Sequence, residues 1–264
     1  MATLLVIPAR FASSRYPGKP LVELRGVDGT PRSLIARSWD AAQQVKGVDR
    51  IVVATDDARI RIAAEGFGAE VVMTSSNCRN GTERCAEAAQ KLDGYDTIVN
   101  LQGDAPLTPP WFIEDLIDAM QASGIPVTTP VLRCDADALN GFQQDRENGR
   151  VGGTTAVFDK AGRALYFSKE VLPYTGRRFS AGEDIPVFHH VGVYAYRAQV
   201  LQEYLTWPEG HLEKWEGLEQ LRFMENGTSV HCVEVNARGR AFWELNNPVD
   251  VARLEKILSD QGMV

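Results

Sequence analysis

The sequence predicts an α/β fold, in which a mostly parallel, Rossmann-like sheet carries helices on both faces. Short apolar runs without polar alternation recur along the first 101 residues, as expected for strands that are buried on both sides. Segments with helical apolar spacing separate these runs, and alternating strands and helices produce parallel sheets. The length of 264 residues suits one domain of this kind.

The clearest elements lie in the first half of the chain. We predict strands at residues 4–7, 51–54, 71–73 and 98–101, and helices at residues 31–44, 58–65, 82–92 and 110–120. Right-handed crossovers bring the carboxyl ends of parallel strands to one edge of the sheet, where ligands bind. Residues that directly follow a strand are therefore candidate site residues.

Beyond residue 125 the strand-like runs are expected to extend the sheet. We predict strands at residues 126–132, 154–158, 190–196 and 241–245, a polar loop at 179–186, and helices at 212–224 and 248–258. Asn247 is the expected N-cap of the last helix, because Pro248 suits its first turn.

Composition and charge disfavour several functions. The formal net charge of −7 is unfavourable for general nucleic-acid binding, so an anionic ligand requires locally clustered Arg and Lys. The apolar run at the N-terminus is too short for insertion into a membrane. The cysteines lack the spacing of a zinc site and predict reduced thiols in a cytoplasmic protein: Cys78, Cys85, Cys134 and Cys232.

The segment after the first predicted strand carries the strongest functional signal. Residues 8–20 read PARFASSRYPGKP and contain three cations, Arg10, Arg15 and Lys19. Arg binds phosphate oxygens in a planar fork and Lys acts as a point charge, so the loop suits a triphosphate. It matches neither GxxxxGK[ST] nor GxGxxG, and the alternative is a solvated basic loop. Asp104, soon after the strand at 98–101, suits Mg²⁺; the alternative is a turn aspartate.

The string IPAR-x-x-S-x-R-x-PGKP resembles the opening signature of the sugar-activating cytidylyltransferases, and most closely that of the CMP-Kdo synthetases (3-deoxy-manno-octulosonate cytidylyltransferases). The segments ATDD, MTSSNCRNGTER, NLQGDAP, ALYFSK, HHVGVYAYR and LEQLR follow in the family's order. The resemblance implies a fold of the nucleotide-diphospho-sugar transferase type in one domain, residues 1–264. A nucleotide-binding half is expected at about 1–125, and a half for sugar binding and dimerisation at about 126–264.

The resemblance also implies roles for individual residues. The catalytic residues are expected to be Arg10, Arg15, Lys19 and Asp104. The nucleotide is expected to contact Ala9, Arg10, Ser13, Lys19, Asn80, Gly81 and Arg84, with Thr82 as a helix cap. The sugar acid is expected to contact Arg15, Gln102, His190, Glu219 and Gln220, and Mg²⁺ to bind Asp104 and Asn246. From the residues alone, Arg84 and Glu219 would be solvated helix-surface groups, and His190 a structural histidine.

The sequence departs from the family pattern at three places. Ala105 replaces the carboxylate of QGDEP, and Asn246 replaces the Asp of VDTPED, so negative charge is lost near the expected metal. In a strand at 241–245, Glu244 would share a face with Asn246 and would restore a carboxylate. The segment RVGGTT at 150–155 lacks the Lys of a VKVV-like strand, which leaves a related sugar acid, such as an amino-substituted Kdo, as an alternative substrate.

The implied reaction transfers CMP from CTP to a Kdo-type sugar acid for lipopolysaccharide or capsule synthesis, and releases pyrophosphate. One alternative is a nucleotide-sugar binding protein that has lost catalysis, because of Ala105 and Asn246. Another is a dinucleotide-dependent dehydrogenase, which the missing GxGxxG disfavours. The resemblance further implies a homodimer, with a contact over about residues 175–189 and the neighbouring strands.

Overall fold

The computed structural model describes residues 1–12, 16–151, 153–245 and 247–263. Within them a ten-stranded sheet has the order β5-β4-β1-β6-β11-β7-β10-β8-β9, with β12 paired to β7, and β2 and β3 form a separate hairpin. The strands are β1 Thr3–Ala9, β2 Glu23–Arg25, β3 Pro31–Ser33, β4 Arg50–Thr55, β5 Val71–Met73, β6 Thr97–Leu101, β7 Val127–Arg133, β8 Thr154–Phe158, β9 Ala164–Ser168, β10 Phe188–His190, β11 Val193–Arg197 and β12 Val230–Glu234.

Helices lie on both faces of this sheet, as predicted. They are α1 Leu34–Ala42, α2 Ala58–Gly66, α3 Gly81–Lys91, α4 Pro110–Ser123, α5 Ala136–Glu147, α6 Ala198–Thr206, α7 His211–Glu216, α8 Leu221–Glu225 and α9 Asp250–Asp260. In β1, Leu4 packs in the core with α3, α6 and α8, whereas its neighbour Leu5 packs with α1, α2 and α4. Strands covered on both faces are apolar throughout, which explains the continuous apolar runs. No helix among the described residues is long and apolar enough to span a membrane.

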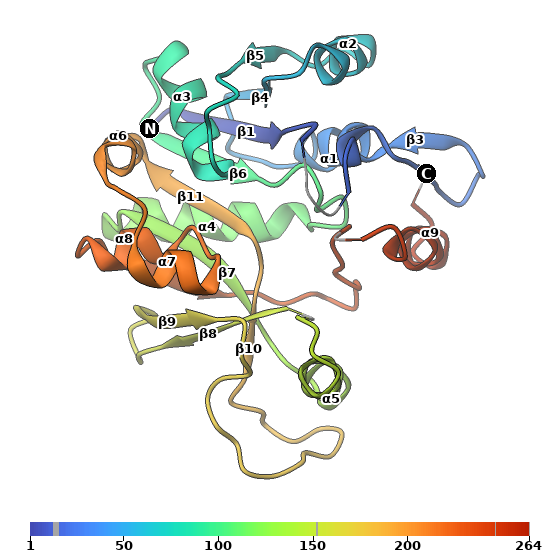
Figure 1. Cartoon of the computed structure of the whole chain (residues 1–264), viewed down its shortest axis with the longest axis vertical. Helices are drawn as coiled ribbons and strands as arrows, with labels where there is room; N and C mark the ends of the chain where they lie inside the picture. Colours follow the sequence, from blue (N-terminus) through green and yellow to red (C-terminus); the bar gives the residue numbers. More distant parts are fainter. Residues whose placement is uncertain (13–15, 152, 246, 264) are drawn as a thin grey trace.

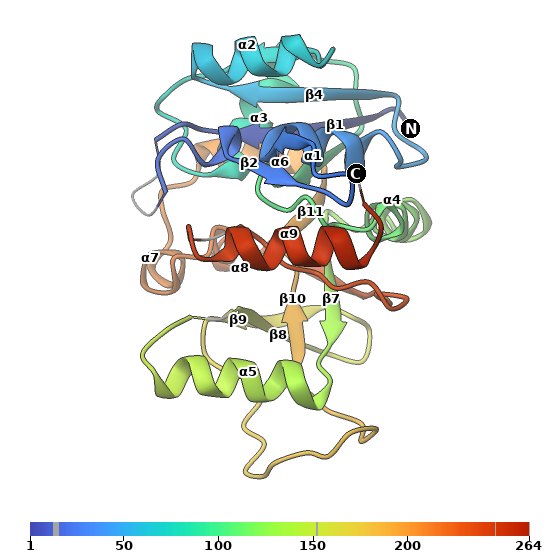
Figure 2. The same cartoon turned by 90° about the vertical axis from the view of Figure 1, so that its right-hand side faces the viewer.

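The sheet has a parallel part and an antiparallel part. Strands β4, β5 and β6 join β1 in parallel register, whereas β11 runs antiparallel to both β6 and β7. Strands β8, β9 and β10 continue the antiparallel part, and β12 returns parallel to β7. Figures 1 and 2 show this second part extending along the long axis, with α5 and the segment between β9 and β10 at its far end.

The helix predicted over 212–224 is wrong, because it is two short helices. Helix α7 ends at Gly217, which has the left-handed conformation with φ 62°, and α8 begins only at Leu221. A left-handed residue terminates a helix, and glycine adopts this conformation without a Cβ penalty. Glu219 and Gln220 therefore lie in the turn between two helices and not on a helix face.

Several other boundaries differ from the prediction. The strand expected over 190–196 is interrupted at Val191 and Gly192, and the segment 241–245 is irregular. The helix expected from residue 31 begins at Leu34, after β3. Asn247 is not the N-cap of α9: the helix begins at Asp250, whose carboxylate accepts the Asn247 backbone N–H at 2.7 Å. Elements α5, α6, β9 and β12 were not predicted.

Candidate active site

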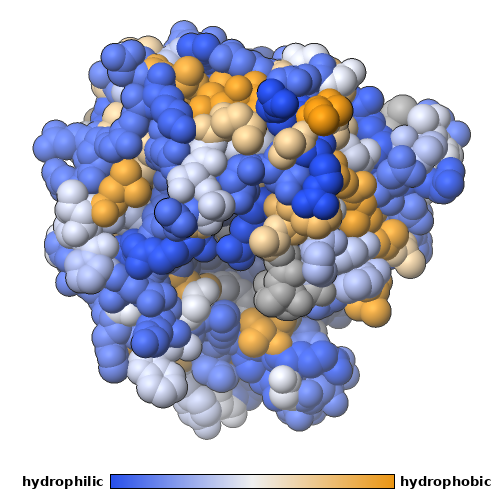
Figure 3. Space-filling view, turned by 45° about the horizontal axis from the view of Figure 1, so that its top comes forward, coloured by the Kyte–Doolittle hydropathy of each residue, from blue (hydrophilic) through white to orange (hydrophobic). Residues whose placement is uncertain are grey.

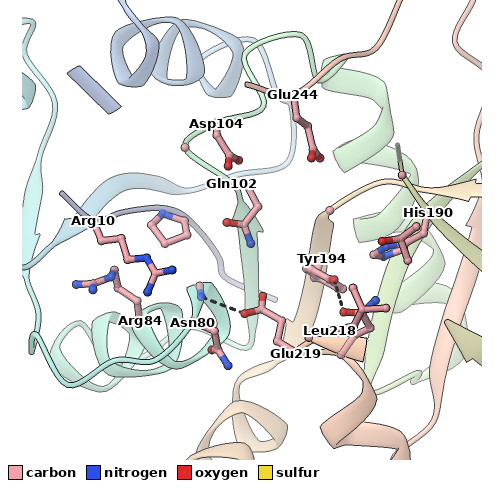
Figure 4. A pocket seen from close by; sticks show the side chains of 18 of the residues that line it. Arg10, Asn80, Arg84, Gln102, Asp104, His190, Tyr194, Leu218, Glu219 and Glu244 are labelled. Atoms are coloured by element: carbon pink, nitrogen blue, oxygen red, sulfur yellow. Dashed lines mark hydrogen bonds between the residues drawn. The ribbon is translucent and has the colours of Figure 1, made fainter. Parts of the chain in front are cut away.

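A cavity of ≈ 680 Å³ lies where β1 and β6 end, between the two parts of the sheet. Its size falls within the range of about 300–1,000 Å³ that is typical of small-molecule sites. One wall carries Arg10, Asn80 and Arg84, and the opposite wall carries His190 and Tyr194 (Figure 4). Figure 3 shows a face of the molecule that is hollowed near its centre and bordered largely by hydrophilic residues.

The first strand delivers its loop directly to this cavity. Ala9 ends β1 almost fully buried, and the exposed Arg10 follows it, so the chain leaves the core at the cavity wall. The Arg10 guanidinium donates through Nη1 to the backbone carbonyl of Arg79 at 3.3 Å. This contact holds the cation beside the turn that precedes α3. The predicted site residues Ser13 and Arg15 lie outside the described residues.

Lys19 returns from the loop to the same wall. Gly18 has φ 71°, and its N–H donates to the Phe11 carbonyl at 2.9 Å, which closes the loop into a turn. The Lys19 ammonium forms an ion pair with the Asp104 carboxylate, and the two side chains are 16 % and 25 % exposed. The structure therefore brings together a cation and an anion that lie 85 residues apart in the sequence.

The segment after β6 packs closely against its neighbours, and Gly103 leaves no room for a side chain. A Cβ at Gly103 would lie 2.9 Å from the backbone oxygen of Pro8, so a side chain would push the ends of β1 and β6 apart. A Cβ at Gly81 would lie 2.8 Å from Nε2 of Gln102. The Gln102 side chain is thus confined between the α3 N-terminus and the cavity. Each predicted residue of this segment, Gln102 and Asp104, lines the cavity.

The turn at residues 80–82 forms the start of α3. The N-cap is Asn80, whose Oδ1 accepts the backbone N–H of Glu83 at 2.8 Å, a typical capping contact. Thr82 is therefore not the cap that we expected, and its hydroxyl instead lies near Tyr196 and Glu219. Asn80 and Gly81, which are expected nucleotide contacts, both line the cavity.

Arg84 is not a solvated helix cation. Its side chain is 3 % exposed, and Nη1 donates to the Thr74 hydroxyl at 2.5 Å and lies 3.3 Å from Asp56 Oδ1. These partners follow β4 and β5, so the parallel strands themselves fix the guanidinium. Arg84 also lines the cavity, on the same wall as Asn80 and Gly81.

His190 lines the cavity from the end of β10. Its Nε2 lies 2.9 Å from the Thr129 hydroxyl, and burial lowers the pKa of His190 to about 3. The imidazole is therefore neutral at physiological pH, and it offers a hydrogen bond and not a positive charge to an anionic ligand.

Gln220 lines the same cavity and carries a buried donor without a partner among the described residues. Its side chain is buried, its Oε1 accepts the Tyr194 hydroxyl at 3.1 Å, and its Nε2 has no hydrogen-bond partner among the described residues. A buried amide without a partner is unfavourable by about 1–3 kcal/mol, so it marks a place where a ligand would bind. The dashed bond at Tyr194 in Figure 4 is this contact.

Glu219 reaches across the cavity to the turn at residues 80–82. Its carboxylate accepts the backbone N–H of Gly81 at 3.1 Å, which is the dashed bond at Glu219 in Figure 4, and the Thr82 hydroxyl at 3.0 Å. Burial raises the pKa of Glu219 to about 7, although both hydrogen bonds favour the ionised form. The expectation of a solvated helix face is wrong for this residue.

Two carboxylates point into the cavity near Lys19. Leu245 donates its N–H to the Asp104 carbonyl at 3.1 Å, so the irregular segment 241–245 lies against the segment after β6. Figure 4 shows the Asp104 and Glu244 side chains entering the cavity from the same side. Ala105, which follows Asp104, is fully buried and does not line the cavity. Asn246 lies outside the described residues. Among the residues that are described, no group of three or more His, Cys, Asp or Glu side chains could hold a metal ion.

The sequence did not mark a buried ion-pair network behind the cavity. Arg222 is 1 % exposed and contacts Glu213 at 2.5 Å and Glu83 at 3.0 Å. It therefore links the α7–α8 segment to α3. From the sequence alone, these three charged residues would be expected at the surface, because spacing along short helices does not indicate burial.

The comparisons with known proteins cover almost the whole chain. Residues 4–233 match the family model described as Cytidylyltransferase. The chain is 41 % identical, over 99 % of both sequences, to a 3-deoxy-manno-octulosonate cytidylyltransferase of Maricaulis maris. It is 36 % identical to the mitochondrial enzyme of the same name from Arabidopsis thaliana, over 98 % of this chain and 83 % of that one.

A solved structure agrees with this result. It is a CMP:2-keto-3-deoxy-manno-octonic acid synthetase in complex with CTP, with TM-score 0.83 and 32 % identity over 99 % of this chain and 100 % of that one. Sequence and fold thus agree, and the chain belongs to the cytidylyltransferase family of nucleotidyltransferases.

Proposed function

We propose that this chain transfers CMP from CTP to the anomeric hydroxyl of a Kdo-type 3-deoxy-ulosonic acid. The observation that carries the proposal is the cavity shared by the Arg10 and Lys19 cations and the polar wall of His190, Glu219 and Gln220. The names of the similar proteins support Kdo as the acid. The product would then feed lipopolysaccharide or capsule synthesis.

The proposed chemistry is one displacement at phosphorus. The anomeric oxygen of the sugar bonds to the α-phosphorus of CTP. The bond from that phosphorus to the oxygen that bridges the α- and β-phosphorus atoms breaks, and pyrophosphate leaves with the electron pair. The hydroxyl proton passes to water. Arg10, Arg15 and Lys19 neutralise phosphate charge, and catalysis rests on positioning and electrostatic stabilisation.

The two walls divide the recognition. Ala9, Ser13, Asn80, Gly81 and Arg84 are the proposed nucleotide contacts, with the backbone at residues 80–82 facing the cytosine edge. Gln102, His190, Glu219 and Gln220 are the proposed sugar contacts, together with Arg15. The unpartnered Nε2 of Gln220 supports this division, because a carboxylate or hydroxyl oxygen of the sugar satisfies it.

We further propose Mg²⁺ as the metal, held by Asp104 with Asn246 or Glu244. The donor set fits, because Mg²⁺ is usually bound by one or two carboxylates together with substrate phosphates. When bound, the ion would supply charge neutralisation on the triphosphate. Figure 4 places the Glu244 carboxylate in the same region of the cavity as Asp104.

Titration with Mn²⁺ tests the Glu244 assignment. Binding is followed by electron paramagnetic resonance with CTP present and no sugar, so the readout does not depend on turnover. Glu244→Gln is expected to weaken Mn²⁺ affinity about tenfold, whereas Glu209→Gln, at another cavity carboxylate, leaves it unchanged. Unchanged affinity in Glu244→Gln would leave Asn246 as the second ligand.

A pyrophosphate-release assay with CTP, Mg²⁺ and a panel of ulosonic acids tests the function. Release with Kdo supports the proposal, and release only with an amino-substituted Kdo changes the substrate. CTP binding without release across the panel indicates a nucleotide-sugar binding protein in place of an enzyme.

We also propose a cytoplasmic homodimer with functional halves at about 1–125 and 126–264. The far end of the antiparallel part supports a contact over about residues 175–189, because Tyr174 is 93 % exposed and Leu165 on the edge strand β9 is 54 % exposed. The buried, unpaired thiols of Cys85, Cys134 and Cys232 fit a reducing compartment. Light scattering is expected to give twice the 29.1 kDa monomer mass, and a value near 29.1 kDa contradicts the dimer.

A further inference from the structure

We propose that the Glu219 carboxylate fixes the nucleotide-side turn at residues 80–82, so that a residue of the sugar-side wall sets affinity and selectivity for the base. This inference rests on the proposed function. It assigns Glu219 a positioning role that operates without any sugar, in addition to the sugar contact proposed above.

The direct contacts use both carboxylate oxygens. Oε2 accepts the Gly81 backbone N–H at 3.1 Å, and Oε1 accepts the Thr82 hydroxyl at 3.0 Å. Gly81 and Thr82 are the first two residues of the 11-residue helix α3, where backbone N–H groups have no partner within the helix. A carboxylate at this end also complements the helix dipole. The two contacts therefore fix the path of the backbone into α3.

Tyr204 provides a second, independent link between the same two segments. The Asn80 side chain donates through Nδ2 to the Tyr204 hydroxyl at 3.0 Å, and that hydroxyl donates to the backbone carbonyl of Glu219 at 3.2 Å. Tyr204 is fully buried, so water does not replace it. Residue 80 is thus tied to the sugar-side turn through its side chain, and residues 81 and 82 through the carboxylate.

The turn that carries Glu219 is itself anchored. Gly217 ends α7 in the left-handed conformation and redirects the chain toward α3. Three residues after Glu219, the buried Arg222 pairs with Glu83 of α3 and Glu213 of α7. Glu219 is therefore held by groups on both sides, and its position does not depend on a ligand.

This arrangement separates base recognition from phosphate binding. Arg10 and Lys19 bind phosphates by charge, and among the described residues their side chains donate to the Arg79 carbonyl and the Asp104 carboxylate and not to Glu219 or Tyr204. A base edge read by the backbone at residues 80–82 needs donors and acceptors at fixed positions, whereas charge neutralisation tolerates small displacements. Loss of the Glu219 contacts should therefore reduce discrimination between bases more than affinity for a triphosphate.

Isothermal titration of CTP and UTP without sugar tests the inference. Glu219→Gln is expected to raise the Kd of CTP about three- to tenfold and that of UTP less than twofold, so the preference for CTP over UTP decreases. The sign is informative, because removing a negative charge near an anionic ligand would by itself tighten binding. Glu216→Gln is the matched control: this carboxylate lies on α7 and contacts Ser168 and Lys169 and not α3.

Thr82→Val removes one contact without any change of charge and provides a second variant in case Glu219→Gln does not fold. It is expected to weaken CTP binding. The double variant, which combines Thr82→Val with Glu219→Gln, is expected to bind CTP no more weakly than Glu219→Gln alone. Unchanged or tighter CTP binding in either single variant, or full additivity in the double variant, overturns the inference. Failure of the wild-type chain to bind CTP would instead overturn the proposed function.

Discussion

The two walls of the cavity are built in different ways. The wall made by the parallel part presents residues that follow strands directly: Arg10 after β1, Gln102 and Asp104 after β6. The wall made by the antiparallel part presents His190, Glu219 and Gln220, which come from a strand end and an interhelical turn and are held by buried polar contacts.

The difference follows from topology. Parallel strands deliver their carboxyl ends to one edge by connectivity alone, so a short loop is enough to position a charged group there. The antiparallel part has no common edge of this kind, and its side chains are aimed by partners such as Thr129, Tyr194 and Arg222. Substitutions on the first wall should therefore affect chemistry, whereas those behind the second wall should affect stability or sugar binding.

The largest expected effect tests the first wall. Asp104→Asn removes the carboxylate that faces Lys19 and the proposed metal, and kcat/KM is expected to fall about a thousandfold. Steady-state pyrophosphate release measures it, with the exposed Asp93→Asn as the control for loss of one charge. Retention of more than about a tenth of the activity would contradict the role of Asp104.

The second prediction tests the network behind the other wall. Arg222→Met leaves the buried Glu213 and Glu83 without their cation and is expected to lower the free energy of unfolding by about 3–5 kcal/mol. Arg50→Met breaks a half-exposed ion pair with Glu70, at the edge of the parallel part, and is expected to lower it by less than about 1 kcal/mol. Urea titration measures both, and equal losses would remove the contrast between the two regions.

The third prediction concerns sugar recognition alone. Tyr194→Phe removes the hydroxyl that holds the Gln220 amide, so the KM for the sugar is expected to rise about tenfold while kcat changes little. The Kd of CTP is expected to stay at the wild-type value, because Tyr194 makes none of the contacts to residues 80–82. A fall in kcat with unchanged KM would show that Tyr194 acts on the reaction and not on Gln220.

The last prediction is a pH dependence of stability. Burial lowers the pKa of His190 to about 3 in the folded chain, below its ordinary value of 6.5, so its contribution to stability is present above pH 6.5 and is lost as the pH falls from 6.5 toward 3. As the pH falls from 6.5 toward 3, the free energy of unfolding is expected to decrease less steeply for His190→Gln than for the wild type. The two slopes are expected to differ by up to about 1.4 kcal/mol per pH unit. His189, with a pKa lowered to about 4 by burial, acts in the same sense.

Glu219 opposes these histidines. Burial raises its pKa to about 7 from 4.5, so its contribution to stability is present below pH 4.5 and is lost as the pH rises through 7. The difference between His190→Gln and wild type, measured by urea titration at several pH values, therefore isolates the histidine. Parallel pH profiles for the two proteins would show that His190 is not held neutral by the fold.

The same contrast explains what the sequence predicts. Strands β1, β4, β5 and β6 were found within one or two residues, because continuous apolar runs between helical segments have one common explanation. The break at Gly217 was missed, because Leu212, Trp215 and Leu218 have helical spacing. In the structure Trp215 is 79 % exposed, so that spacing did not report burial.

The residues of the candidate site also differ in how far the sequence predicts them. The cations after β1 and Asp104 followed from position and charge, whereas the sugar contacts came from resemblance alone. Tertiary packing places Arg84 and Glu219 at the cavity, and no local pattern encodes this packing. The roles of Ser13, Arg15 and Asn246 stay predictions, because these residues lie outside the described part of the chain.

The hydrogen bond from Leu245 to Asp104 has a consequence for biosynthesis, because it joins residues 141 positions apart. Strand β6 and the loop after β1 leave the ribosome well before the segment that carries Glu244, which follows β6 by more than 100 residues. Helix α9 then covers the β2–β3 hairpin, where Val27 donates to the Met263 carbonyl at 2.8 Å. A chain that lacks residues 241–263 therefore exposes the apolar face of that hairpin, and it lacks both the Glu244 segment of the cavity and the α9 part of the core.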